Sequence, residues 1–202
     1  MAHEIPQEGQ RANHPNGLPS SASRYSAVAM ALHWIMAALI VWNLASMMLT
    51  PQAWARTLLP THMAVGLTVL LLSLVRLLWR LTHRWPPLPA TIPLWERRLA
   101  RGSHALFYVL MLAVPLSGWL MVSASSGRAV NWFGVASIPP LPVASSRYAV
   151  AAFYEMHEIG ATLMAGLLLL HVAGALRHSL PDGGTPLLLR MLPRRSAYQK
   201  KS

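Results

Sequence analysis

The sequence predicts an all-α integral membrane protein built as a bundle of four transmembrane helices. Apolar residues make up 54% of the 202-residue chain and charged residues only 11%, whereas soluble domains carry about 25% charged residues. The apolar residues are concentrated in four stretches, each long enough to supply the roughly 20 residues that cross a bilayer. The 17 Lys and Arg residues lie mainly beside these stretches, so the net charge of +11 indicates a membrane surface and not nucleic acid.

The segment 1–23 is rich in Pro, Gly, Ser and Asn and has few large apolar residues, so we expect a disordered tail. It lacks the apolar region of a signal peptide, and no cleavage is expected. The four-helix domain is expected over 24–195, followed by a basic C-terminal tail over 196–202.

The first two helices are predicted from apolar runs bounded by proline. The first is expected over 27–49, because Thr50 and Pro51 follow it directly. The second is expected over 62–81, starting after Pro60.

The third helix is expected over 102–122, after a cluster of arginines. Pro115 lies inside it and is expected to kink the helix without ending it, because neighbouring helices can satisfy the freed carbonyl. The fourth is expected over 153–177, with Pro181 beyond its end.

Basic residues are distributed unevenly between the connecting segments. The first connection carries only Arg56, and the third only Arg128 and Arg147. The second connection and the C-terminal segment carry eleven, namely Arg80, Arg84, Arg97, Arg98, Arg101, Arg177, Arg190, Arg194, Arg195, Lys200 and Lys201. The positive-inside rule therefore predicts that both termini and the second connection are cytoplasmic.

Five histidines fall in or at the ends of the predicted spans: His33, His62, His104, His157 and His171. Ionisable residues inside a membrane are costly and functional by default, although any single one could cap a helix or bond a polar neighbour. The chain has no cysteine, which excludes iron–sulfur clusters, thiolate zinc sites and cysteine-attached haem. Any metal must therefore be bound by histidine.

The histidines divide between two depths. His171 follows His157 by 14 residues, about 21 Å and close to four turns along one helix, so both project from the same face. His157 is expected to pair with His62 near the outer side. His171 can pair with His33 or His104, and we favour His33 because His104 lies at the start of its span and is shallower.

Two imidazoles at each of two levels are what two b-type haems require, each iron taking ligands from different helices. A catalytic zinc ion needs three ligands close together, which two separate levels do not offer. The pair His157 and Glu158 begins like a zinc-protease motif, but no second histidine follows at the required spacing. Room for a flat macrocycle, or for close helix packing, would come from Gly66, Gly118, Gly166 and Gly174.

The chain resembles the bacterial cytochrome b561 family, four-helix di-haem membrane proteins that include superoxide:ubiquinone oxidoreductases. The similar segments are RYSAVAMALHW around His33, HMAVGLTVLLLSLVRLLWRL from His62, HALFYVLMLAVPLSGWLM from His104, WFG at 132–134 and MHEIGATLMAGLLLLHVAGALRH from 156. The resemblance implies that His33 and His171 bind the cytoplasmic haem, and that His62 and His157 bind the periplasmic haem.

The resemblance further implies an oxidoreductase of the bacterial inner membrane that passes electrons from superoxide, at the periplasmic face, to ubiquinone. Arg56, Arg128 and Arg147 are the candidates to steer superoxide, although each could be an ordinary solvated loop charge.

A quinone site would use His104, His178, Arg101 and Arg177 at the cytoplasmic end, unless the arginines only anchor the chain to anionic lipid. The family often has a histidine where this chain has Arg101, and this departure weakens any fixed role for His104.

A second hypothesis is a haem-bearing electron-transfer subunit that accepts electrons from a periplasmic dehydrogenase, a hydrogenase or a soluble cytochrome. The ligands cannot separate the two hypotheses, and the long connection 123–152 is large enough for docking. A transporter or a haem-free structural bundle is a third hypothesis, and it predicts a colourless protein.

Overall fold

The computed structural model describes residues 25–83, 93–177 and 191. The predicted tails, 1–23 and 196–202, and His178 lie outside the described residues. In chain order the elements are α1 (Ala27–Met48), α2 (Gln52–Thr82), α3 (Leu94–Ser126), β1 (Val130–Trp132), β2 (Ala136–Ile138) and α4 (Arg147–Arg177). Each of the four helices is long and apolar enough to cross a membrane.

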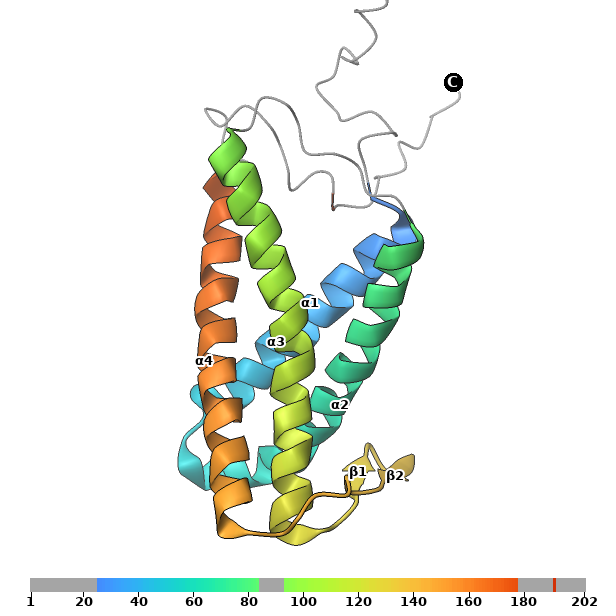
Figure 1. Ribbon diagram of the computed structural model, residues 1–202, viewed down its shortest axis with the longest axis vertical. Helices are drawn as coiled ribbons and strands as arrows, with labels where there is room; N and C mark the ends of the chain where they lie inside the picture. Colours follow the sequence, from blue (N-terminus) through green and yellow to red (C-terminus); the bar gives the residue numbers. More distant parts are fainter. Residues whose placement is uncertain (1–24, 84–92, 178–190, 192–202) are drawn as a thin grey trace, which may run out of the picture.

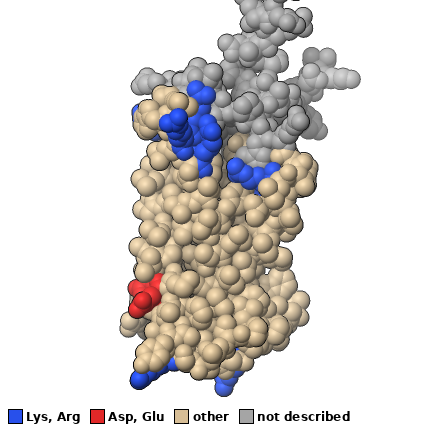
Figure 2. Space-filling view, in the orientation of Figure 1, with Lys and Arg blue, Asp and Glu red and all other residues tan. Residues whose placement is uncertain are grey.

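Helices that follow one another in the chain run in opposite directions, so the bundle has two distinct ends (Figure 1). We call the end that holds the start of α3 and the end of α4 the basic end. The opposite end, where β1 and β2 lie, is the hairpin end. Lys and Arg side chains gather at the basic end, fewer lie at the hairpin end, and an almost uncharged belt separates them (Figure 2). This distribution is typical of a protein that spans a lipid bilayer.

α1 has nearly the bounds expected from the sequence, whereas α2, α3 and α4 extend beyond their expected apolar spans. α1 begins after Ser26, whose hydroxyl accepts a hydrogen bond from Ala29 N at 3.2 Å. α2 begins at Gln52 and continues through Pro60, which the sequence had suggested as its boundary. α3 contains Pro115 without ending there, as expected.

α3 and α4 also start well before the expected spans, because a helix does not end where the hydrocarbon ends. α3 begins eight residues early, at Leu94, and stops before Gly127, whose φ of 60° is readily adopted by glycine. α4 begins six residues early, at Arg147.

A small apolar core lies between the helices and is rich in methionine. Its buried members are Met36, Leu110, Met111 and Met164. Most large apolar side chains instead point outward, and Leu170 of α4, for example, is 72% exposed. An outward apolar surface is expected for a bundle whose solvent is lipid.

The connection between α3 and α4 contains a β-hairpin that the sequence did not predict. β1 and β2 pair antiparallel, with Val130 opposite Ile138. Val135 N donates to the Trp132 carbonyl at 2.9 Å and closes a β-turn. Its central residues, Phe133 and Gly134, have positive φ, 50° and 75°, as in a type I′ turn. The Trp132 indole nitrogen donates to Thr68 Oγ1 at 3.0 Å, which attaches the hairpin to α2.

The four glycines expected to allow close approach do not behave alike. A Cβ at Gly118 would lie 3.0 Å from the His157 ring, so this glycine is required for a close contact. At Gly66 a Cβ would make only an ordinary contact, 3.6 Å from the Asn43 side chain. At Gly166 and Gly174 it would meet no described atom within 4 Å, so close helix packing does not explain these two.

Candidate functional site

Two histidines face each other in the half of the bundle nearer the hairpin end. His62 of α2 and His157 of α4 have ring centroids 6.0 Å apart, and their ring planes are inclined by 80°. Both side chains are half-buried. We call this the hairpin-side pair, and it brings together the two histidines that the sequence placed near the outer face.

Neighbouring backbone and hydroxyl groups fix one ring nitrogen of each histidine in this pair. His157 Nδ1 lies 2.8 Å from the Val114 carbonyl oxygen, which can only accept, so Nδ1 donates. The Ser46 hydroxyl donates to the Asn43 carbonyl at 2.8 Å and therefore accepts from His62 Nδ1 at 3.4 Å. Each Nε2 is left with a free electron pair, the form in which imidazole binds a metal.

Three histidines meet in the half nearer the basic end. The ring centroids of His33 (α1) and His171 (α4) are 6.3 Å apart, and we call these two the basic-side pair. His104 of α3 is also close, with its centroid 5.6 Å from that of His171.

The position of His104 near the start of its apolar span does not keep it away from His171. α3 starts at Leu94, before that span, and the ring of His104 is within pairing distance of the ring of His171. Ring distance does not separate His33 from His104, and the choice of His33 remains a prediction.

Arg76 is a member of this cluster that the sequence reasoning missed. Its Nη2 lies 3.4 Å from His33 Nδ1, and its Nε donates to the Tyr108 hydroxyl at 3.4 Å. The signal was available in the sequence, because Arg76 is a charged residue inside an apolar span. The sequence interpretation rested on the histidines alone among the ionisable residues of the predicted spans.

The predicted quinone-site residues are only partly brought together. His104 lies within the bundle, while Arg101, one turn earlier on α3, is exposed at the basic end. Arg177 forms an ion pair with Glu96 at 3.7 Å, and this links the end of α4 to the start of α3. Its side chain is 71% exposed.

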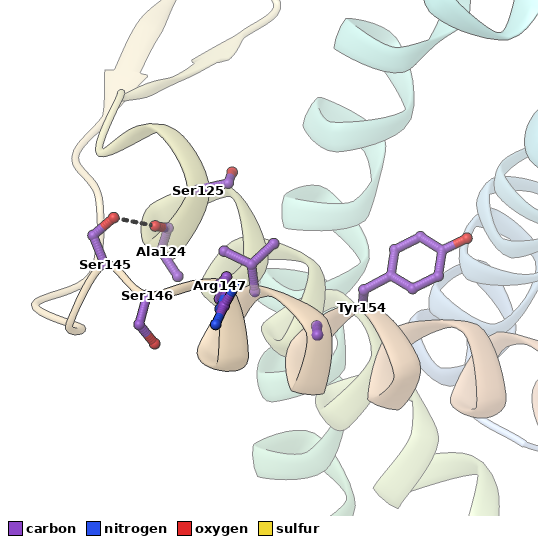
Figure 3. Close-up of a pocket in the computed structure, with 8 residues that line it drawn as sticks. Ala124, Ser125, Ser145, Ser146, Arg147 and Tyr154 are labelled. Atoms are coloured by element: carbon purple, nitrogen blue, oxygen red, sulfur yellow. Dashed lines mark hydrogen bonds between the residues drawn. The ribbon is translucent and has the colours of Figure 1, made fainter.

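The three arginines proposed to steer an anion are all exposed at the hairpin end: Arg56, Arg128 and Arg147. Arg147 lines a shallow pocket of about 550 Å³ between the end of α3 and the start of α4 (Figure 3). The other polar lining residues are Ser125, Ser145, Ser146 and Tyr154. Ser145 donates to the Ala124 carbonyl at 2.8 Å and joins the two sides.

The paired histidines fit a group bound between them. Two imidazoles that bind one metal from opposite sides, each at about 2 Å, have ring centres about 6 Å apart. Both observed separations, 6.0 and 6.3 Å, match that value.

The packing of the helices also leaves the paired histidines on helices that are not closely packed against each other. Among the described elements, the closely packed helix pairs are α1–α2, α2–α3 and α3–α4. The paired rings come instead from α2 with α4 and from α1 with α4, as a flat group between them requires. In the described ranges no three His, Asp or Glu side chains form a site for a bare metal ion. The fold and the spacing of the histidine pairs together are those of a multipass membrane cytochrome of the b type.

Comparison with known proteins agrees with this class. Residues 24–194 match the family described as prokaryotic cytochrome b561, and the chain belongs to that family. It is 30% identical to cytochrome b561 homolog 1 of Escherichia coli (strain K12), over 86% of this chain and 99% of the relative. It is 29% identical to cytochrome b561 homolog 2 of the same strain, over 59% of this chain and 66% of the relative. The chain is thus a bacterial multipass b-type cytochrome that functions in electron transfer.

Proposed function

We propose that this chain binds two b-type haems, one between His62 and His157 and one between His33 and His171, and carries electrons from superoxide to ubiquinone. The observation that carries the proposal is the spacing of the two imidazole pairs, 6.0 and 6.3 Å, at two levels of one bundle. When bound, each haem supplies one-electron redox chemistry. The four histidines would hold one such group at each of the two levels of the bundle.

The orientation in the inner membrane follows from the charge distribution. The described connecting segments place Arg80, Arg97, Arg98, Arg101 and Arg177 at the basic end, against three arginines at the hairpin end. The basic end is therefore cytoplasmic in this proposal, and the hairpin end faces the periplasm.

At the hairpin end, the chain would guide a small anion toward the hairpin-side pair. Arg147 lines the pocket at the start of α4, and His157 follows ten residues later on the same helix. Positive charge raises the local concentration of an anion and its rate of encounter. Two superoxide anions would give one electron each and leave as two molecules of O₂.

At the basic end, ubiquinone takes two electrons and two protons to become ubiquinol. His104 is suited to pass on a proton, because it lies beside His171 and a neutral imidazole can donate a hydrogen from one ring nitrogen and accept one at the other. Phe107, one turn further on α3, contacts the His171 ring at 5.2 Å and supplies an apolar wall. Arg101 could hydrogen-bond a quinone oxygen, whereas Arg177 is engaged by Glu96.

A second candidate function is a subunit that accepts electrons from a periplasmic protein. The turn of the hairpin favours it, because Phe133 and Val135 are 52% and 77% exposed there. Exposed apolar side chains at a loop tip can anchor a partner.

A two-stage experiment tests these proposals. Reduced-minus-oxidised spectra and a pigment-to-protein ratio come first, and we expect two haems per chain. Superoxide is then pulsed onto the purified protein with a soluble quinone, and haem reduction is followed by stopped flow. Reduction faster than uncatalysed dismutation supports the superoxide proposal. Two haems that superoxide does not reduce favour the partner-subunit function, and a colourless protein removes both.

A further inference from the structure

Arg76 is a permanent cation inside the bundle, surrounded by the basic-side histidines. The arginine is half-buried and contacts His33 and Tyr108, each at 3.4 Å. It also interacts electrostatically with His104 and His171. Arginine does not lose its proton in proteins, so this charge needs a negative partner.

The described part of the chain does not supply that partner. Of its carboxylates, Glu96 pairs with Arg177 at the basic end. Glu155 and Glu158 are exposed on the hairpin half of α4. A charge held within a membrane span is normally paired or turned toward a functional site. Arg76 therefore points to an anion that is not one of these side chains.

The contact with His33 leads to the same conclusion. A histidine that binds a metal through Nε2 carries its hydrogen on Nδ1. Nδ1 of His33 would then present a donor to the guanidinium, which is itself only a donor. Arg76 must turn to a different acceptor when His33 binds iron.

A second arginine lies one turn further along α2. The guanidinium carbon of Arg80 lies 5.2 Å from the centre of the Tyr108 ring, and its charge also acts on His104. Like charges four residues apart on a helix repel each other. Two neighbouring negative charges at Tyr108 would offset this repulsion.

We propose that Arg76 and Arg80 bind the two propionate carboxylates of the haem held by His33 and His171. The inference rests on the proposed function, because it requires a haem at this level. Haem carries two carboxylates on one edge, and guanidinium groups bind carboxylates in a bidentate manner. The Tyr108 hydroxyl accepts from Arg76 and keeps its own hydrogen for the same carboxylates. The propionate edge of this haem then points toward the basic end.

The test is a redox titration of the full-length Arg76→Gln variant, together with electrochemical infrared difference spectra. Positive charge beside a haem favours its reduced form, so we expect one of two midpoints to fall. At a fixed potential the reduced-to-oxidised ratio should change about tenfold, which is about 59 mV for one electron. The propionate carboxylate bands should shift as well.

Two further variants separate charge from contact. Arg76→Lys keeps the charge but loses the bidentate geometry, so its midpoint should stay near wild type while the carboxylate bands move. If Arg76→Gln does not fold or bind haem, the carboxylate bands of Arg76→Lys still test the proposed contact. Arg98→Gln is the matched control, because it removes one exposed charge at the same end of the bundle. Both of its midpoints should be unchanged.

Unchanged midpoints and carboxylate bands in Arg76→Gln and Arg76→Lys would overturn the inference. So would a loss of co-purifying anionic lipid with unaltered propionate bands, because the guanidinium would then bind a lipid phosphate. A wild-type protein with one haem, lost in His33→Ala, contradicts the two-haem proposal alone, because the midpoint of that haem still reports on Arg76. If that midpoint does not change in Arg76→Gln, the propionate contact is wrong as well. If the one haem is lost in His62→Ala instead, both proposals are wrong.

Discussion

Gly118→Ala places a methyl group against a proposed haem ligand. The new Cβ would lie 3.0 Å from Cε1 and 3.1 Å from Nδ1 of His157, so the ring must retreat by a few tenths of an ångström. The ring is held in place, because Nδ1 of His157 is hydrogen-bonded at 2.8 Å to the carbonyl of Val114. Val114 lies one turn before Gly118 on α3, so the bond and the new methyl group come from neighbouring positions. Any retreat lengthens that bond and moves Nε2.

The expected cost follows from two opposing effects. Overpacking costs about 1–3 kcal/mol, and alanine gains about 0.5–1 kcal/mol over glycine within a helix. The midpoints of the two ranges leave a net loss of about 1 kcal/mol, or about 5-fold in an equilibrium constant. The loss should fall on the hairpin-side haem, because the contact involves His157 alone.

The assay is the haem-to-protein ratio during heating, with the two haems distinguished by their midpoints. Gly102→Ala is the matched control, since Gly102 lies on the same helix and a Cβ there meets no described atom within 4 Å. This control should be as stable as wild type or slightly more so. Equal haem retention in the two variants, or selective loss of the basic-side haem from Gly118→Ala, would refute the reasoning.

Three further predictions concern other parts of the molecule. His33→Ala should remove one of two haems in a pyridine haemochrome assay and His104→Ala neither; the reverse result would make His104 the ligand. Trp132→Phe removes the 3.0 Å bond to Thr68 and should cost about 1 kcal/mol, seen as faster hydrogen exchange over 130–138; unchanged exchange contradicts this attachment. Arg147→Gln should slow haem reduction by superoxide several-fold at low salt only, and an equal effect at high salt would exclude steering by charge.

The four membrane-spanning helices could be predicted from sequence because the signal is strong and local. About 20 consecutive apolar residues have few alternatives to a spanning helix, since lipid cannot satisfy backbone polar groups. The level of each histidine followed from its position in an alternating bundle. For His62 and His157 this was enough, and the structure brings their rings to 6.0 Å.

The position of His104 could not be predicted in the same way. The apolar pattern reports where the hydrocarbon lies, whereas the helix continues through the headgroup region as long as its backbone bonds are satisfied. α3 therefore starts at Leu94, eight residues before the apolar span. Distance from the start of a span therefore does not decide which histidine lies beside His171, and the structure brings the ring of His104 to 5.6 Å from it.

The β1–β2 hairpin and the role of Arg76 could not be predicted from the sequence for a different reason. The strands 130–132 and 136–138 are three residues each, too short for a periodic pattern, and their stability depends on the turn and on Thr68 of α2. Arg76 has a clear local signal, but its meaning depends on which residues of α1 and α3 surround it. Such a neighbourhood is defined only by the packing of the helices.

The two proposed haem levels depend on α4, because that helix alone supplies a histidine to each. The 14 residues from His157 to His171 set an axial separation of about 21 Å, which side-chain rotations cannot change. α4 is held against α3 by Glu96 with Arg177 at the basic end and by the Val114 carbonyl with His157 in the hairpin half. Electron transfer is sensitive to distance, so the α3–α4 pair acts as the fixed frame. His33 of α1 and His62 of α2 each complete one site on it, so replacing either histidine should disturb one haem and leave the other in place.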